Sequence, residues 1–253
     1  MKKEKAHAKL SASGSEIWLE CPGSVSLSEK APPKTETIYM AEGTKAHKLL
    51  ELWLLHILKT SMAFIIPKGY PKEMVGAVKI AVKEIEKRWN RGKNGTLIPE
   101  RKIYLTNVGP EMWGTADVTI LEHYGLLTVL DYKHGSGHVV EIEDPTTGAL
   151  NTQAIYYALG AADEQDWDFI EAEIGIIQPR ALHHAGAVRT KRIPIKQLKK
   201  YEDVFKKGVD EVNKPKPYFK FGPHCLWCVC KPICSEYKKS ANNAAALAFA
   251  GLE

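Results

Sequence analysis

Three charged residues near the middle of the chain could carry out metal-dependent hydrolysis. Asp131 and Lys133 follow the apolar, β-prone run at residues 126–130, and residues two apart in a strand point to the same side of it. Asp117 belongs to a second β-prone segment, which can pair antiparallel to the first through a turn at residues 122–125. Carboxylates bind hard divalent cations, and a lysine beside such a cation stabilises charge on a phosphoryl group. The pattern predicts phosphodiester hydrolysis, although an isolated Asp-x-Lys tripeptide is common in exposed hairpins.

Residues elsewhere in the chain could complete this site. Gln153 and Tyr157 are four apart on a predicted helix, so their side chains share one helix face. His47 stands on an earlier predicted helix and Glu100 on a predicted strand. Taken singly, a helical histidine or a Gln–Tyr pair is more often structural than functional. These residues are therefore candidates only in combination with the central carboxylates.

Hydrophobic periodicity and turn residues predict a chain of mixed helices and strands. A basic tail is expected over residues 1–9, a loop up to residue 37, and an extended linker at residues 214–217. Residues after 240 are alanine-rich and could form a helix or a disordered tail. Predicted helices include residues 17–19, 40–59, 71–90, about 151–162 and 195–212, and predicted strands are residues 97–106, 113–121, 126–133, 171–178 and 187–193.

Length and composition are those of an ordinary water-soluble protein. The chain has 253 residues, of which 44% are hydrophobic and 26% charged, enough for one large α/β core. The longest apolar stretches are too short or too interrupted to span a membrane, and the N-terminus lacks the apolar segment of a secretory signal. We therefore expect one cytoplasmic domain over residues 1–253, with no membrane partner.

Positive and negative side chains are unevenly distributed. Residues 107–178 hold 13 acidic residues and a single Lys or Arg, Lys133, whereas residues 1–106 and 179–240 have net charges of +8 and +10. An acidic centre between basic arms suits a metal site in a phosphate-binding cleft. Solvated lysine-rich helices explain the distribution equally well. In the second basic arm, we predict nucleic-acid contacts from Arg189, Lys191 and Arg192.

All five cysteines lie near the chain ends. One is Cys21, and the other four, Cys225, Cys228, Cys230 and Cys234, fall within ten residues. Disulfides are rare in the cytosol, so this density indicates a metal. Zinc would take four thiolates. An iron–sulfur cluster would take three cysteines of the C-x2-C-x5-C frame and a fourth from elsewhere. Cys21 can supply that fourth ligand, which leaves Cys230 spare, and free structural thiols remain the alternative.

The order of these features resembles a known family. Gly-Thr-Ala-Asp at 114–117, Asp131-x-Lys133 and Gln153-x3-Tyr157 resemble the RecB-like branch of the PD-(D/E)XK nuclease superfamily. The split cysteine set looks like its iron–sulfur form, found in AddB-type helicase-nucleases and CRISPR-associated adaptation exonucleases. The resemblance covers residues 10–236. It implies an α/β fold with a restriction-endonuclease-like core, in which a mixed central sheet is flanked by helices and the two chain ends are joined at a cysteine metal cluster.

The resemblance also implies a role for each motif residue. His47, Asp117 and Asp131 would bind Mg²⁺ or Mn²⁺, with help from the backbone carbonyl of Tyr132. Lys133 would position the hydrolytic water and stabilise the transition state. The other implied assignments are Gln153 and Tyr157 for orienting substrate and lysine, and Cys21, Cys225, Cys228 and Cys234 for a structural 4Fe–4S cluster. Apart from the resemblance, Glu100 and Cys230 are additional candidates for the two sites.

Together these features predict a metal-dependent DNA nuclease. An exonuclease on single strands or free ends is expected, in recombination, repair or phage genome processing, alongside recombination or replication proteins. Residues 40–213 would form the nuclease core, residues 10–39 and 214–240 the cluster-binding segments, and residues 241–253 a tail. The alternatives are a catalytically silent DNA-binding or assembly module with the same fold, and a zinc-ribbon protein in which the cysteines bind Zn²⁺.

Overall fold

A five-stranded mixed sheet forms the centre of the computed structural model, which describes residues 8–33 and 35–250, with only the backbone for residues 244–250. The strands lie side by side in sequence order; β3 and β4 are parallel, and all other neighbours are antiparallel. The strands are β1 (Gly95–Tyr104), β2 (Trp113–Glu122), β3 (Leu126–Tyr132), β4 (Glu171–Ile177) and β5 (Val188–Pro194).

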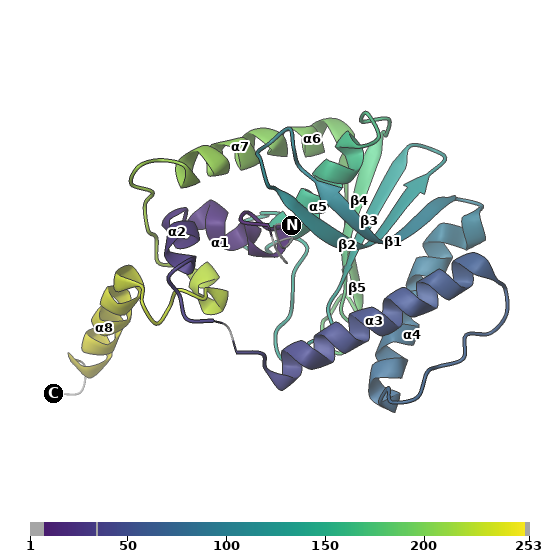
Figure 1. The fold of residues 1–253 in the computed structure, drawn as a ribbon, viewed down its shortest axis with the longest axis horizontal. Coiled ribbons are helices and arrows are strands. Elements are labelled where there is room, and N and C mark those ends of the chain that lie inside the picture. The colour runs from purple at the N-terminus through teal and green to yellow at the C-terminus, as the bar shows by residue number, and fades with distance from the viewer. Residues whose placement is uncertain (1–7, 34, 251–253) are drawn as a thin grey trace, which may run out of the picture.

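Helices cover both faces of this sheet (Figure 1). On one face, α3 (Ile38–Lys59) and α4 (Lys72–Trp89) bury their apolar stripes against side chains of β2 and β3. The other face is covered by α5 (Thr152–Asp163), which connects the parallel strands β3 and β4, together with α1, α6 and α7. The remaining helices are α1 (Ser15–Glu20), α2 (Gly23–Ser28), α6 (Ile195–Lys199), α7 (Tyr201–Val212) and α8 (Ser235–Ala250), with short 3-10 turns at Ala12–Gly14, Asn90–Gly92 and Pro223–Trp227.

The predicted order of elements is confirmed, with local exceptions. The predicted loop contains a helix, α2, which begins directly after Pro22 and buries Val25. The helix predicted over residues 195–212 is divided, because the amide of Lys200 bonds the carbonyl of Gln197 and interrupts the i, i+4 pattern. The alanine-rich tail is helical as far as Ala250. Residues 1–7 of the predicted basic tail and residues 251–253 lie outside the described residues.

Segments from the two ends of the chain lie side by side. In Figure 1 the purple helices α1 and α2 sit against the yellow-green segment that precedes α8. The amide of Gly23 donates a hydrogen bond to the carbonyl of Tyr218 over 2.9 Å, and Lys220 forms an ion pair with Glu20. Among the described residues, no helix combines the length and the apolar character that a membrane span requires.

Candidate functional site

Three carboxylates lie in one row across neighbouring strands. The pairing of β1 with β2 has the same register on both sides of Glu100, which places Glu100 opposite Asp117, although these two residues are not themselves paired in the ladder. The last pair between β2 and β3 is Val118 with Leu130, so Asp117 and Asp131 occupy the next position along the two strands and are not paired. The ladder therefore opens where the two aspartates meet. Glu100 has a positive φ of 48°, a conformation that a residue other than glycine seldom adopts inside a strand.

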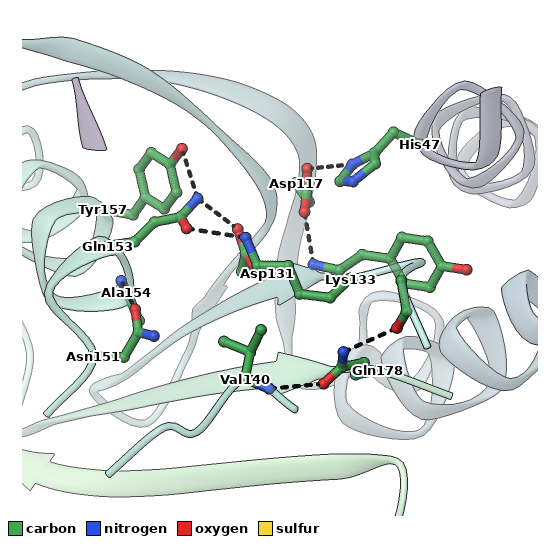
Figure 2. A network of polar contacts seen from close by, with 12 residues as sticks. His47, Asp117, Asp131, Lys133, Val140, Asn151, Gln153, Ala154, Tyr157 and Gln178 are labelled. Carbon is green, nitrogen blue, oxygen red and sulfur yellow. Dashed lines mark hydrogen bonds and ion pairs between the residues drawn. The ribbon is translucent and has the colours of Figure 1, made fainter. Parts of the chain in front are cut away.

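Asp117 is held from two directions at this opening. His47, on α3, places its Nδ1 2.9 Å from Asp117 Oδ1 (Figure 2). The backbone N–H of Tyr132 donates to Asp117 Oδ2 over 2.7 Å, in place of a bond between strands. One ligand atom from each of His47, Glu100 and Asp117 lies within 4.8 Å of the others. These three residues therefore form a candidate metal centre between α3 and the sheet.

Asp131 is the centre of an adjoining network that involves α5. Lys133 Nζ lies 2.8 Å from Asp131 Oδ2 and donates to Gln153 Oε1 over 3.0 Å. Gln153 Nε2 donates to Asp131 Oδ1 over 2.9 Å and lies 3.5 Å from the hydroxyl of Tyr157. Figure 2 shows these side chains converging from β3 and α5 beside Asp117. The structure thus brings together residues that are far apart in sequence.

Local sequence fixes how α5 presents this network. The side chain of Asn151 caps the helix by accepting from the amide of Ala154 over 3.1 Å. Gln153 and Tyr157 then follow one turn apart on the same face. A Cβ on Gly114 would lie 2.9 Å from Cε1 of Tyr157. Glycine at this position of β2 therefore leaves the space that the tyrosine ring occupies.

The charges of the site depend strongly on one another. Burial lowers the pKa of His47, but Asp117, with smaller contributions from Asp131 and Glu100, outweighs this effect and raises it to about 9. Burial and the nearby Asp117 raise the pKa of Glu100 to about 7. Burial also raises the pKa of Asp131 against the opposing effect of Lys133. The carboxylates are therefore crowded, as expected where a positive charge is required.

The donor atoms fit a hard divalent cation. Asp131 Oδ2 is buried and has the Lys133 ammonium 2.8 Å away as its partner, so Asp131 lies beside the group of ligand atoms formed by His47, Glu100 and Asp117 and is not part of it. Carboxylate oxygens and one imidazole nitrogen are ligands that Mg²⁺ and Mn²⁺ accept. Asp117 and Glu100 supply further oxygens close to His47. The predicted ligand role of the Tyr132 carbonyl stays a prediction, since the contact found at this residue is made by its N–H.

The five cysteines gather around a single pocket at the side of the fold. Cys21 lines it from the N-terminal segment, and Phe219, His224 and Tyr237 complete the wall. Two backbone amides point at sulfur: that of Lys220 lies 3.4 Å from Cys21 Sγ, and that of Tyr237 lies 3.4 Å from Cys234 Sγ. The cysteines contributed by the C-terminal segment are Cys225, Cys228, Cys230 and Cys234.

Cys230 differs from the other cysteines of this pocket. It is 1% exposed, and its Sγ donates to the carbonyl of Ser24 over 3.4 Å. Burial and the neighbouring thiol of Cys228 raise its pKa to about 12. In its present contacts Cys230 therefore acts as a hydrogen-bond donor that links the C-terminal segment to α2.

Comparison with known proteins places the chain in a family. The sequence profile of the family described as "Protein of unknown function (DUF2800)" matches residues 7–252. The chain belongs to this family. It is also similar to the crystal structure of a candidate exonuclease from Eubacterium rectale, with 11% identity and a TM-score of 0.52, covering 94% of this chain and 92% of that one. The structure of the protein SSO0001 matches with 14% identity and a TM-score of 0.42, over 93% of this chain and 88% of that one. At these identities, the first likeness concerns the fold, and the second carries no argument.

In this DUF2800 family member, the predicted basic strand does not present Arg189 to solvent. Arg189 is 4% exposed, and its guanidinium donates to the carbonyl of Val140 and to Gln178 Oε1, both over 2.8 Å. The prediction of a nucleic-acid contact for Arg189 is wrong, because the residue faces inward and ties β5 to the loop after β3. Lys191 and Arg192 are at the surface, in ion pairs with Glu143 and Glu173 respectively.

Gln178 is a site-supporting residue that the sequence reasoning missed. Its Nε2 donates to the carbonyls of Gly135 and His138 over 2.9 and 2.7 Å, and its Oε1 accepts from the amide of Val140 over 3.0 Å (Figure 2). These bonds hold the loop that directly follows Lys133. Its position in the sequence could have indicated this role. Gln178 directly follows β4, Lys133 directly follows the parallel strand β3, and the carboxyl ends of parallel strands lie at the same edge of a sheet.

Proposed function

We propose that this protein is a divalent-metal-dependent nuclease that hydrolyses phosphodiester bonds in DNA. The observation that carries the proposal is the convergence of Asp117, Asp131 and Lys133 where β2 and β3 separate, with His47 beside them. An Asp-x-Lys pair in an exposed hairpin would not be buried, whereas Asp117 is 7% and Asp131 4% exposed. Burying two carboxylates this close together is costly unless a cation compensates them.

Each residue has a distinct part in this mechanism. His47, Asp117 and Asp131, with Glu100 as a further donor, would hold Mg²⁺ or Mn²⁺. When bound, such a cation polarises the phosphoryl group and lowers the pKa of the attacking water. Lys133 stays charged, because Asp131 raises its pKa against the effect of burial, so its ammonium can hold the water and stabilise developing negative charge.

Gln153 has a positioning role in this scheme. It donates to Asp131 through Nε2 and accepts from Lys133 through Oε1, so one amide sets the separation of the carboxylate and the ammonium. Tyr157 lies behind it, and we assign it the orientation of Gln153 and of the bound strand. Removing either side chain is expected to misplace Lys133 without removing a charge.

We further assign the fold to the RecB-like branch of the PD-(D/E)XK superfamily. The mixed sheet with helices on both faces supports this assignment, as does the order of motifs from His47 to Tyr157. The similar Eubacterium rectale structure bears the description of an exonuclease, and we propose the same mode here, on single strands or free ends. The proposed setting is cytoplasmic, in recombination, repair or phage genome processing, with recombination or replication proteins as partners.

For the cysteine pocket we propose a 4Fe–4S cluster held by Cys21, Cys225, Cys228 and Cys234, with Zn²⁺ as the alternative. Their convergence from both chain ends supports a metal, and amides directed at Sγ atoms are typical partners of metal-bound thiolates. Cys230 is left out because it is 1% exposed and its thiol donates to the Ser24 carbonyl over 3.4 Å, whereas the Sγ of Cys225 lies 3.9 Å from the nearest carbonyl that it contacts. Hydrolysis moves no electrons, so the cluster would join the chain ends. Iron analysis and visible absorption after anaerobic purification distinguish it from colourless zinc.

A cleavage assay tests the nuclease proposal. End-labelled single-stranded DNA is incubated with the protein and Mn²⁺, and Asp131→Asn and Lys133→Met are compared with Asp210→Asn, a change at an exposed position of α7. We expect cleavage by the wild type and by Asp210→Asn, and a loss of at least about 100-fold in both site variants. Salt-sensitive binding without cleavage by the wild type would instead assign the silent DNA-binding module.

A further inference from the structure

Beyond the carboxylate row, the hairpin of β1 and β2 carries one cation and two aromatic rings at its surface. Lys102 Nζ lies 4.7 Å from the ring centroid of Trp113 and 5.4 Å from that of Tyr104. Tyr104 and Trp113 are cross-strand partners, and Tyr104 is 42% exposed. Lys102 is exposed as well. We call Lys102, Tyr104 and Trp113 the hairpin platform.

The hairpin platform shares a sheet face with the candidate metal centre. Ile103 and Ala116 belong to the core beneath α5, and successive residues of a strand alternate between faces. Lys102 and Trp113 therefore point to the opposite face, the one on which α3 places His47. Lys102 lies two residues from Glu100 along β1, and Trp113 lies four residues from Asp117 along β2. These separations correspond to about 7 and 14 Å.

This arrangement offers what one strand of nucleic acid can bind. In an extended nucleic-acid strand, the distance between successive phosphates is similar to the distance between Glu100 and Lys102 along β1. An ammonium such as that of Lys102 can pair with phosphate oxygens. Aromatic side chains stack with unpaired bases, and this stacking is generally stronger than the attraction between an exposed ammonium and a ring. A nucleotide can thus offer a phosphate to Lys102 and a base to Trp113 at the same time. Bases inside a duplex are already stacked and cannot do so.

We propose that the hairpin platform binds single-stranded DNA next to the bond that is cut, with Lys102 on a phosphate and Trp113 and Tyr104 stacked on bases. This inference rests on the proposed nuclease function and names the part of the surface that selects single strands. It places the strand along β1 and β2, leading away from the carboxylate row toward the far end of the hairpin.

Fluorescence anisotropy of the full-length protein in EDTA measures this binding without cleavage. The ligands are a labelled oligothymidine, the same backbone with abasic positions, and a duplex. We expect Trp113→Leu and Tyr104→Leu to weaken oligothymidine binding about 10-fold, Trp113→Phe to retain most of it, and neither leucine variant to affect the abasic strand. Tyr124→Ala, which removes an 85% exposed tyrosine of the β2–β3 turn, is the matched control.

Salt dependence tests the lysine separately. Lys102→Met should weaken binding to both the oligothymidine and the abasic strand, and should reduce the slope of log Kd against log salt by about 0.7, the value for one phosphate contact with a single strand. A change that merely disturbed the hairpin would leave that slope unaltered. Thermal unfolding of each variant shows whether it is folded, and the more exposed Tyr104 provides the test if Trp113→Leu is not.

The outcomes separate this inference from the nuclease proposal. If the wild type cleaves DNA with Mn²⁺ but the platform variants bind like the wild type, the nuclease proposal stands and the platform is refuted. If binding depends on Trp113 and no cleavage occurs, the platform is supported and the nuclease proposal fails. Equal binding of single strand and duplex, or no binding of oligothymidine by the wild type, overturns the inference.

Discussion

Replacing Glu100 by glutamine should stabilise the metal-free protein at alkaline pH. Burial raises the pKa of this carboxyl from 4.5 to about 7, with a further contribution from Asp117. The contribution of this carboxyl to the free energy of unfolding is therefore fully present below about pH 4.5 and is lost as the pH rises through about 7. For a fully enclosed group, the loss would be about 3 kcal/mol. Because the side chain is partly exposed, screening reduces it to about 1–2 kcal/mol.

Thermal unfolding in EDTA measures this effect. At about pH 8.5, we expect Glu100→Gln to unfold about 2–8 °C above the wild type, and at about pH 4.5 the two should coincide. Glu36→Gln, a change at an exposed position outside the sheet, should show no such difference. Mn²⁺ should reverse the order, because a cation at 100 times its Kd stabilises the wild type by about 2.7 kcal/mol and the variant lacks one donor. A variant that is no more stable than the wild type at alkaline pH would refute this account of the carboxylate row.

Two further predictions concern parts of the fold that support the site. Burial alone would raise the pKa of Glu173, but hydrogen bonds from Arg88 and Arg192 outweigh it and lower the pKa. Glu173→Gln should therefore destabilise the protein by about 1–2 kcal/mol at neutral pH, and denaturant titrations should show this difference shrink below about pH 4; a constant difference would refute the ionic origin. Cys225→Ser should reduce soluble, folded, iron-containing protein much more than Cys230→Ser, because metal binding is coupled to folding; equal yields and iron contents would contradict the ligand assignment.

The sequence predicted the elements that local patterns determine. The apolar run of β3 and the amphipathic stripe of α3 are each visible within a few residues, so their bounds agree closely with the structure. Helix α2 was missed because its Gly-Ser-rich segment has little helical propensity. It is held instead by contacts from the other end of the chain, such as the bond from Gly23 to Tyr218.

Features that depend on register and long-range packing were harder to predict. Glu100 could be named as a candidate, but its place opposite Asp117 follows from the pairing of β1 with β2 and from a positive φ that no local pattern indicated. Arg189 looked like a surface cation because its neighbours are basic. It is buried by partners that only the fold supplies, namely Gln178 and the carbonyl of Val140.

The central claim is that Asp117 and Asp131 share one divalent cation. Anomalous diffraction from crystals grown with Mn²⁺ tests it directly. We predict one strong peak bound by His47, Asp117 and Asp131, with Glu100 as a further donor and Lys133 adjacent, and its loss in Asp131→Asn crystals. A peak that touches only one of the two aspartates, or no peak at saturating Mn²⁺, would contradict the account.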